Sequence, residues 1–186
     1  QRQMCIRDSI NGGEPSISEN YNDLLNNLPN TVKIVRINTN CARPIKQLET
    51  LLISGVTVIV TVSFDGIDRI HDYIRYPVKW KNFEPLLLEY KKLSVKYKNM
   101  KLDTWTTVSA LNVAHLSEIQ SYCADRNIRH QFAFLNEPDP LNVKYCNWLT
   151  KNVKLKGVAI DKDNTDIILN FLQTEESVRQ GIERFW

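Results

Sequence analysis

Residue types that can do chemistry occur in short runs after the apolar, strand-like segments of this 186-residue chain. The most distinctive run is residues 11–15 (NGGEP), where two glycines, lacking side chains, would let the backbone close on a ligand. Taken alone, the run also fits a plain tight turn followed by an exposed carboxylate at Glu14. The other runs therefore have to decide between a binding loop and a simple turn.

Polar side chains follow the later strand-like segments in the same way, namely Asn40, Ser63, Asp65, Asn112 and Glu137. In proteins built on parallel strands, ligands collect at the carboxyl ends of the strands, which predicts a shared binding edge. Asn, Asp and Ser also begin helices after strands, and that structural role fits the same positions. Ser63 and Asp65 are the strongest candidates because they follow the most apolar β-branched run.

Strand and helix patterns alternate along the chain. The sequence predicts strands over residues 31–38, 56–62, 101–109 and 129–135, with a short one near 155. It predicts helices over 18–28, 44–53, 78–97, 116–123, 167–172 and 174–186, and a short helix or an ordered loop over 67–76. The run 56–62 (VTVIVTV) is typical of a parallel strand buried on both faces. Pro85 predicts a kink or a later start in its helix. The alternation favours an α/β fold with right-handed crossovers, in a barrel or a doubly wound sheet.

Composition indicates a single globular domain, since 42% of the residues are hydrophobic and 24% are charged. The net charge of +3 comes from dispersed Lys and Arg, which argues against a nucleic-acid partner. No run approaches the roughly 18 apolar residues of a membrane span, so we expect no membrane partner and a cytoplasmic location. The cysteines lack paired metal-ligand spacing and are expected to be free thiols: Cys5, Cys41, Cys123 and Cys146.

Three of these runs resemble, in order and in spacing, motifs of the radical S-adenosylmethionine (SAM) superfamily, and more narrowly of its twitch or SPASM-like members. Residues 11–15 resemble the family's GGEP motif, and residues 36–40 (RINTN) resemble the end of its third strand. Residues 62–66 (VSFDG) with 71–77 (HDYIRYP) resemble its fourth-strand SxDG motif and the loop that follows. The likeness runs from about residue 10 to residue 142.

The resemblance implies a partial (β/α)6 TIM-like barrel over residues 10–142 and a truncated C-terminal extension over 143–186. It implies SAM as a cofactor, with its methionyl ammonium at the GGEP turn and its ribose and carboxylate near the SxDG run. A guanidinium fork in the following loop suits a carboxylate, although an exposed loop arginine is the ordinary alternative. The implied SAM-binding residues are Gly12, Gly13, Glu14, Pro15, Asn40, Ser63, Asp65, Arg75 and Asn112.

The family's 4Fe-4S cluster is held by a Cys-x3-Cys-x2-Cys loop upstream of GGEP, and this sequence contains no such triad. Residues 1–9 (QRQMCIRDS) resemble translated sequencing-adapter tails, so we expect a non-native tail, with a short frayed strand leading into Ile10 as the alternative. We expect the full-length parent, given an electron donor, to cleave SAM reductively to a 5′-deoxyadenosyl radical, with a peptide or protein as substrate. The fragment, without the cluster ligands, is expected to be inactive.

Two other functions fit parts of the sequence. Residues 132–138 (FAFLNEP) resemble the acid/base segment of barrel glycosidases, in which Glu137 would protonate a glycosidic oxygen. A domain without a cluster would instead bind SAM as a scaffold. The histidines, His71, His115 and His130, share no ligand-like spacing and are expected to lie at the surface or to pack against strands.

Overall fold

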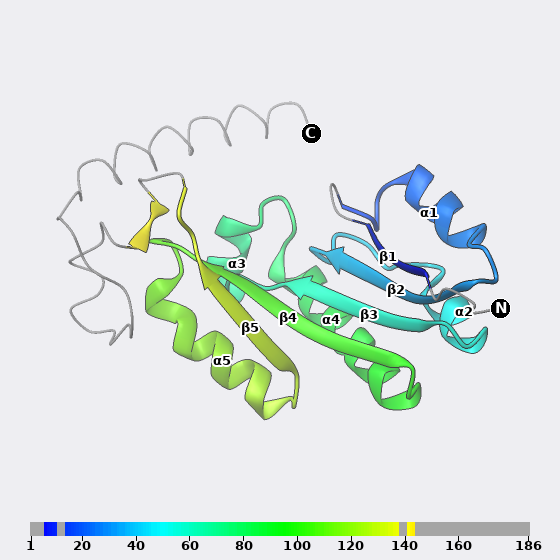
Figure 1. Ribbon diagram of the computed structural model, residues 1–186. Helices are drawn as coiled ribbons and strands as arrows, with labels where there is room; N and C mark the ends of the chain where they lie inside the picture. Colours follow the sequence, from blue (N-terminus) through cyan, green and yellow to red (C-terminus); the bar gives the residue numbers. More distant parts are fainter. Residues whose placement is uncertain (1–5, 11–13, 138–140, 144–186) are drawn as a thin grey trace. The chain divides into compact units, whose positions relative to one another are not determined.

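The computed structural model describes residues 6–10, 14–137 and 141–143, in which strands and helices alternate (Figure 1). In chain order the elements are β1 (Ile6–Ile10), α1 (Glu19–Asn26), β2 (Val32–Thr39), α2 (Leu48–Ile53), β3 (Thr57–Ser63), α3 (Asp68–Ile74), α4 (Trp80–Lys96), β4 (Met100–Val108), the 3-10 turn η1 (Val113–His115), α5 (Leu116–Asp125) and β5 (Arg129–Phe134). The predicted alternation is confirmed up to β5. The strand and helices predicted beyond residue 143 lie outside the described residues.

The five strands form one sheet in the order β1-β2-β3-β4-β5, so each strand lies beside its predecessor in the chain. β1 pairs with β2, β2 with β3 and β3 with β4, all in parallel. Parallel neighbours require a crossover connection, and the intervening helices provide one each time. The predicted α/β class is therefore confirmed, and the arrangement is consistent with part of a barrel.

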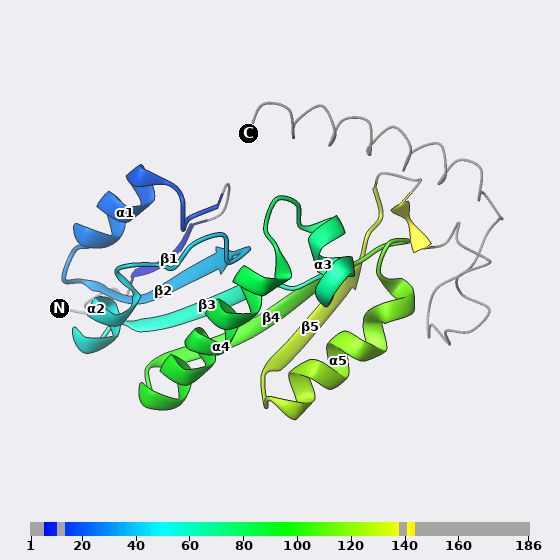
Figure 2. The ribbon, with the colours of Figure 1, turned by 180° about the vertical axis from the view of Figure 1, so that it is seen from behind.

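The strands bury one face and leave the other partly exposed. On β3, Val58, Val60 and Val62 are fully buried, whereas the residues between them are half-buried. The prediction that both faces of this strand are buried is therefore wrong for one of the two faces. The buried face packs against apolar side chains of α1, α2, α4 and α5, and Figure 2 shows α2 and α4 in front of the sheet. Because the described helices α1, α2, α4 and α5 pack against that face, we call the opposite face of β2, β3 and β4 the inner face.

An aromatic cluster joins the end of β3 to α4 and α5. Phe64 stacks on Trp80 and Phe83 with ring centroids 5.8 and 5.6 Å apart, and meets Tyr122 edge-on at 5.3 Å. His71 of α3 is fully buried in the same cluster, 4.2 Å from the Phe83 ring centroid. The prediction that His71 lies at the surface or against a strand is wrong, because α3 directs its imidazole into this aromatic core.

α2 and α4 depart from the sequence predictions in different ways. α2 begins only at Leu48, because the segment before it is tied to α4 by a hydrogen bond from the Ile45 amide to the Tyr90 hydroxyl (3.1 Å). α4 continues through Pro85. The carbonyl that Pro85 leaves without a donor belongs to Lys81, which is exposed to water, so the helix tolerates the proline.

The described residues divide into two compact units: residues 6–10, 14–106 and 118–131 form the first, and residues 107–117, 132–137 and 141–143 belong to the second. The described part of the second unit has a small core of its own, made by Val108, Val113, Leu116 and Val143.

Two expectations about the ends of the chain concern the described residues. β1 agrees with the alternative prediction of a short strand leading into Ile10. The non-native origin of residues 1–9 and the domain boundary after residue 142 stay predictions. Within the described residues, none of the helices combines the length and the apolar character needed to span a membrane.

Candidate functional site

The loops that follow β1, β2 and β3 begin at one edge of the sheet. In the parallel registers Ile10 pairs with Ile37 and Thr39 pairs with Val62, so the three strands end at similar levels. This alignment brings the described parts of the three sequence motifs together within the first unit. Residues 11–13, which include both glycines of the NGGEP run, lie outside the described residues.

Glu14 ties the loop after β1 to the end of β2. Its Oε1 accepts hydrogen bonds from the Thr39 hydroxyl (2.6 Å) and from the Ser16 amide (3.1 Å), and its Oε2 accepts one from the Asn40 amide (2.6 Å). Pro15, the next residue, is buried. A carboxylate offers about four acceptor positions, so these three bonds leave one position on Oε2 for a further donor.

The turn after β2 is held in shape by its own side chains. Thr39 Oγ1 accepts a hydrogen bond from the Cys41 amide (3.0 Å), and Asn40 Oδ1 accepts one from the Ala42 amide (2.9 Å). These bonds support Cys41 at a φ of +57°, a left-handed conformation that costs a residue with a side chain about 1 kcal/mol. Burial, and then the charge of Glu14, raises the pKa of the Cys41 thiol well above its ordinary value, which keeps it a neutral packing group.

We call Glu14 and the three residues bonded to its carboxylate, Ser16, Thr39 and Asn40, the Glu14 clamp. The sequence analysis did not predict Thr39 or Ser16 as members of this clamp. Ser16 is buried, and its Oγ accepts a hydrogen bond from the Arg43 amide (3.1 Å), which joins the loop after β1 to the turn after β2 a second time. Asn40 was predicted as a site residue, and the structure uses its backbone amide on Glu14 and its side chain on the turn. The available signal was a Thr-Asn pair at a strand end, since both side chains commonly bind nearby backbone groups.

The loop after β3 holds a buried carboxylate against a guanidinium. Asp65 is 4% exposed, and its Oδ2 forms an ion pair with Nη2 of Arg75. Arg75 directly follows α3, and its amide donates to the His71 carbonyl (2.8 Å), which fixes the base of its side chain. The Nε of Arg75 is buried and has no hydrogen-bond partner among the described residues. The pair therefore retains one buried donor.

Gly66 permits the close approach of this loop to α3. A Cβ at this position would lie 2.6 Å from Ile70 Cγ2 and 2.8 Å from the His71 nitrogen, closer than side-chain carbons normally approach other atoms. The glycine of the SFDG run thus has a steric role, because it allows Asp65 and Arg75 to face each other across a tight turn.

Ser63 ends β3 on the inner face. Its side chain is half-buried, and its hydroxyl makes no hydrogen bond to the residues that the structure describes. The strand registers place it beside Trp105 of β4 and one residue beyond the level of Thr39 on β2. Ser63 therefore stands at the same edge as the Glu14 clamp, with a hydroxyl that is available to a ligand.

Asn112 lies in the second unit, where its amide closes the loop after β4. Its Oδ1 accepts a hydrogen bond from the Ser109 amide (2.8 Å), its Nδ2 donates to the Thr107 carbonyl (3.0 Å), and the residue is 1% exposed. These contacts match the structural role that the sequence had left open for asparagine after a strand. Glu137, proposed as a glycosidase acid, is exposed.

The described residues of the first unit offer donors and acceptors to polar ligand groups, but they do not fit an iron–sulfur cluster. Within the described residues, no group of three His, Cys, Asp or Glu side chains could hold a metal ion, and Cys41 and Cys123 are buried free thiols. In contrast, Glu14 offers an acceptor, while Ser63 and Arg75 each offer a donor. This donor and acceptor set suits the methionyl and ribose groups of SAM.

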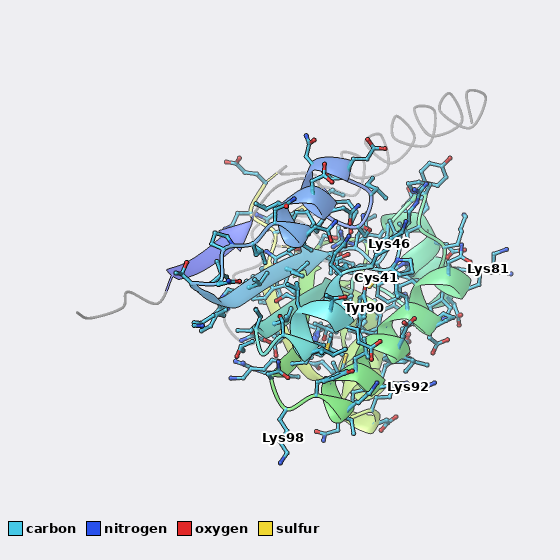
Figure 3. The ribbon with its side chains drawn as sticks, turned by 90° about the vertical axis from the view of Figure 1, so that its right-hand side faces the viewer. Cys41, Lys46, Lys81, Tyr90, Lys92 and Lys98 are labelled. Atoms are coloured by element: carbon cyan, nitrogen blue, oxygen red, sulfur yellow. The ribbon has the colours of Figure 1, made fainter. Side chains whose placement is uncertain are left out.

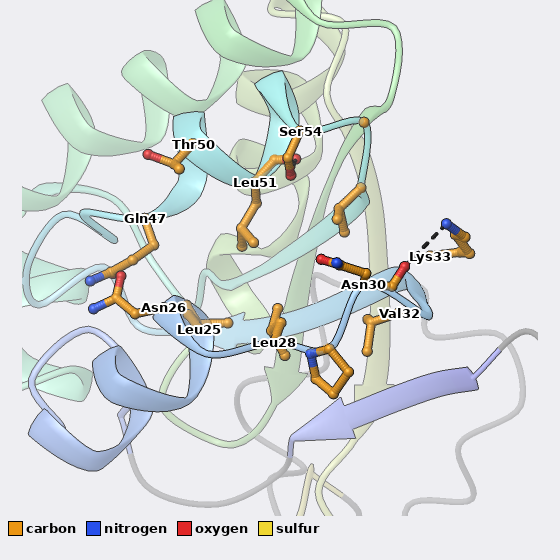
Figure 4. A pocket seen from close by; sticks show the side chains of 13 residues that line it. Leu25, Asn26, Leu28, Asn30, Val32, Lys33, Gln47, Thr50, Leu51 and Ser54 are labelled. Atoms are coloured by element: carbon orange, nitrogen blue, oxygen red, sulfur yellow. Dashed lines mark hydrogen bonds between the residues drawn. The ribbon is translucent and has the colours of Figure 1, made fainter.

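A cavity of about 300 Å³ lies at the opposite, amino ends of β2 and β3. It is lined by α1, α2 and the loops that follow them, and Figure 4 shows Leu25, Leu28, Val32 and Leu51 around it. The Oε1 of Gln47, another lining residue, is buried without a hydrogen-bond partner among the described residues. Its position at the amino ends separates this cavity from the motif-bearing loops.

No family model and no curated protein matches the sequence. Among solved structures, the chain is similar to the crystal structure of SuiB from Streptococcus suis, with a TM-score of 0.55 and 21% identity over 73% of this chain and 31% of SuiB. It is also similar to the crystal structure of Streptococcus suis SuiB bound to S-adenosylmethionine, with a TM-score of 0.55 and 18% identity over 93% of this chain and 37% of SuiB.

The chain thus spans about a third of the length of the SuiB structures that it matches. At this level of identity the likeness concerns the fold alone. It supports the assignment made from the strand order: an α/β fold of parallel strands that alternate with helices, consistent with part of a barrel.

Proposed function

We propose that this chain is the SAM-binding part of a radical SAM enzyme. The observation that carries the proposal is the Glu14 clamp, in which the carboxylate of the GGEP-like run binds the ends of the next strand and keeps one acceptor position unused. The similar structure of SuiB was determined with S-adenosylmethionine bound, which agrees with the proposal at the level of the fold.

Glu14 and the glycines before it would hold the methionyl ammonium of SAM. The remaining acceptor position on Oε2 of Glu14 can take one ammonium hydrogen, and carbonyls of Gly12 and Gly13 are proposed to take the others. The rigid turn after β2 would keep the carboxylate in place when the ligand binds, because Thr39 and Asn40 already orient both of its oxygens.

The loop after β3 would hold the remaining polar groups of SAM. The buried Nε of Arg75 lacks an acceptor among the described residues, and a SAM carboxylate would supply one in a charge-assisted hydrogen bond. Ser63 and Asp65 are proposed to bind the ribose hydroxyls, because a free hydroxyl and a carboxylate are suitable partners for them. Asn112 belongs to the second unit, where its amide is engaged in its own loop, and its part in SAM binding stays a proposal that rests on the sequence resemblance.

Bound SAM would supply the 5′-deoxyadenosyl group that radical chemistry uses. The reducing electron is proposed to come from a 4Fe-4S cluster of the parent enzyme and its electron donor, and no step through that cluster is assigned to the described residues. A peptide or protein substrate is likewise a proposal that rests on the sequence resemblance. The residues described here would bind, orient and desolvate SAM.

Titration of SAM into the purified chain by calorimetry tests the proposal. We expect saturable binding and about a fivefold loss of affinity in Ser63→Ala, which removes one hydrogen bond without touching a contact of the fold. Ser94→Ala is the matched control, since the Ser94 hydroxyl bonds only to the Lys91 carbonyl of its own helix. Absence of SAM binding, or equal loss in both serine variants, would contradict the proposal.

A second variant tests the clamp itself. Glu14→Gln should lower the affinity for SAM at least tenfold, because it removes the charge that faces the ammonium. Glu19→Gln, an exposed position in the first turn of α1, should leave the affinity unchanged. Urea unfolding of both variants separates lost binding from a loosened turn: a Glu14→Gln protein that is fully folded and binds SAM normally would remove Glu14 from the site.

A further inference from the structure

The inner face of the sheet carries exposed cations in one row across three strands. The registers place Arg36 of β2 beside Ile59 of β3, and Ile59 beside Lys101 of β4. Arg36 and Lys101 are exposed, and Ile59 between them is half-buried. Neighbouring strands lie about 4.8 Å apart, so the two cationic residues stand about 10 Å apart, and their long side chains can converge above Ile59.

These two cations have no acidic partner among the residues that the structure describes. The acidic residue of the next row, Asp103, is already paired with Arg129 of β5, with Nη1 and Oδ2 3.8 Å apart. Two like charges facing the same apolar residue repel each other, and an anion placed between them would stabilise both. The charge pattern therefore suits an anionic group above Ile59.

A large aromatic side chain stands on the same face at the edge that carries the proposed SAM site. Trp105 is 38% exposed and lies beside Ser63 in the register of β3 with β4. The distance along β3 from Ile59 to Ser63 is four residues, or about 13 Å. An indole exposed at this point offers a flat apolar surface for a ring or a planar group.

We propose that the inner face binds an elongated anionic substrate, whose carboxylate or phosphate lies between Arg36 and Lys101 and whose flat or apolar part packs on Trp105. The two contacts lie about 13 Å apart, which sets the length of the ligand. That this ligand is the substrate rests on the proposed function, because SAM would then meet it at the Ser63 edge. The anion site itself depends only on the inner face.

Three probes that differ in one group test the inference: 6-phenylhexanoate, 6-phenylhexyl phosphate and the neutral 6-phenylhexanamide, each titrated into the full chain. We expect the better of the two anions to bind at least tenfold more tightly than the amide, and this preference to shrink as salt rises. The comparison of the two anions identifies whether a carboxylate or a phosphate is preferred. Equal binding of amide and anions would overturn the proposal.

Variants of the inner-face residues test whether these residues cause the preference for anions. Arg36→Gln with Lys101→Gln should bring the anion preference close to one, whereas Trp105→Ala should weaken anion and amide alike by about fivefold. Lys81→Gln with Lys92→Gln is the matched control, since it removes the same charge from α4, where both lysines point away from the sheet (Figure 3). If the control variant lowered the preference for anions as much as the Arg36 and Lys101 variant does, the preference would come from net charge. That result would overturn the proposed anion site.

SAM titrations of the same proteins separate this inference from the proposed function. A preserved anion preference in a chain that does not bind SAM would support the inner-face site and contradict the SAM proposal. SAM binding without any anion preference would support the SAM proposal and overturn the inner-face site.

Discussion

The two ends of β2 and β3 are both closed by side chains that bind backbone groups, yet their chemistry differs. At the amino ends, Asn99 Nδ2 donates to the carbonyls of Leu52 (2.9 Å) and Val56 (2.8 Å), which uses both of its hydrogens. At the carboxyl ends, Glu14 keeps an acceptor position and Arg75 keeps a buried Nε without a partner in the described part of the chain. A saturated neutral clamp can only stabilise the fold, whereas a charged clamp with unused capacity can also bind a ligand.

The largest expected loss of stability comes from breaking the ion pair of Asp65 and Arg75 at the carboxyl end of β3. Arg75→Met leaves the Asp65 carboxylate buried without its cation and should lower the free energy of unfolding by about 3 kcal/mol. Asn99→Leu, the counterpart at the amino end, removes two neutral hydrogen bonds and should cost about 1.5 kcal/mol. Urea unfolding measures both. Equal costs would mean that the charges at the carboxyl end do not distinguish it.

Substitutions of two glycines compare the carboxyl end of β3, at Gly66, with its amino end, at Gly55. Gly66→Ala forces a Cβ to within 2.6 Å of Ile70 and should cost about 2.5 kcal/mol, because α3 or the Asp65 loop must move. Gly55, before β3, has a φ of +86° and open space around it, so Gly55→Ala should cost only the backbone strain of about 1 kcal/mol. Thermal unfolding gives the order of the two variants. If Gly66→Ala proved the milder change, the close approach of α3 would be excluded as the reason for this glycine.

His71 makes the carboxyl end of β3 sensitive to pH. Burial, and then the charge of Arg75, lowers its pKa to about 4, against the opposing charge of Asp72. The unfolded chain therefore binds more protons between pH 6.5 and pH 4, and the contribution of the neutral imidazole, full above pH 6.5, is lost as the pH falls. Between pH 7.5 and pH 5 this loss amounts to about 2 kcal/mol.

His71→Phe removes this titration while it preserves an aromatic ring beside Phe83. Urea unfolding of the wild type and the variant at pH 7.5 and pH 5 isolates the histidine from the other groups that titrate. The variant should lose less stability than the wild type on acidification. An identical loss in both proteins would show that His71 keeps an ordinary pKa in the fold.

Local patterns predicted most of the described fold. The β-branched run 56–62 became β3, and the stripe of Trp80, Phe83, Leu87 and Tyr90 became the buried side of α4. The errors arose where tertiary contacts overrode local signals. Ile45 has helical spacing but is tied to Tyr90, and His71 has an ordinary polar type but meets an aromatic cluster assembled from separate elements.

The sequence predicted which loops meet at the edge of the sheet, but not which atoms bond there. Glu14, Ser63 and Asp65 could be chosen from runs after strands, because such runs must lie at one edge of a parallel sheet. Arg75 follows α3 and was implied only by the family resemblance. The role of Thr39 could not be predicted, since it depends on a register that places a hydroxyl 2.6 Å from a carboxylate 25 residues earlier in the chain. Sequence spacing predicts which loops meet, and only the packed structure determines which atoms do.

The smallest expected effect concerns the cavity at the amino ends and has the opposite sign. Gln47 stands before α2 without a side-chain capping bond, and its Oε1 is buried among lining residues such as Leu25 and Leu51 without a partner in the described part of the chain. Gln47→Leu removes this unsatisfied acceptor and adds apolar contact, so it should raise the free energy of unfolding by about 1 kcal/mol. Thr50→Leu, at an exposed lining position, is the control and should change it less. A loss of stability in Gln47→Leu would show that the Gln47 amide has a partner within the cavity, so that Oε1 would no longer count as an unsatisfied acceptor at the amino end.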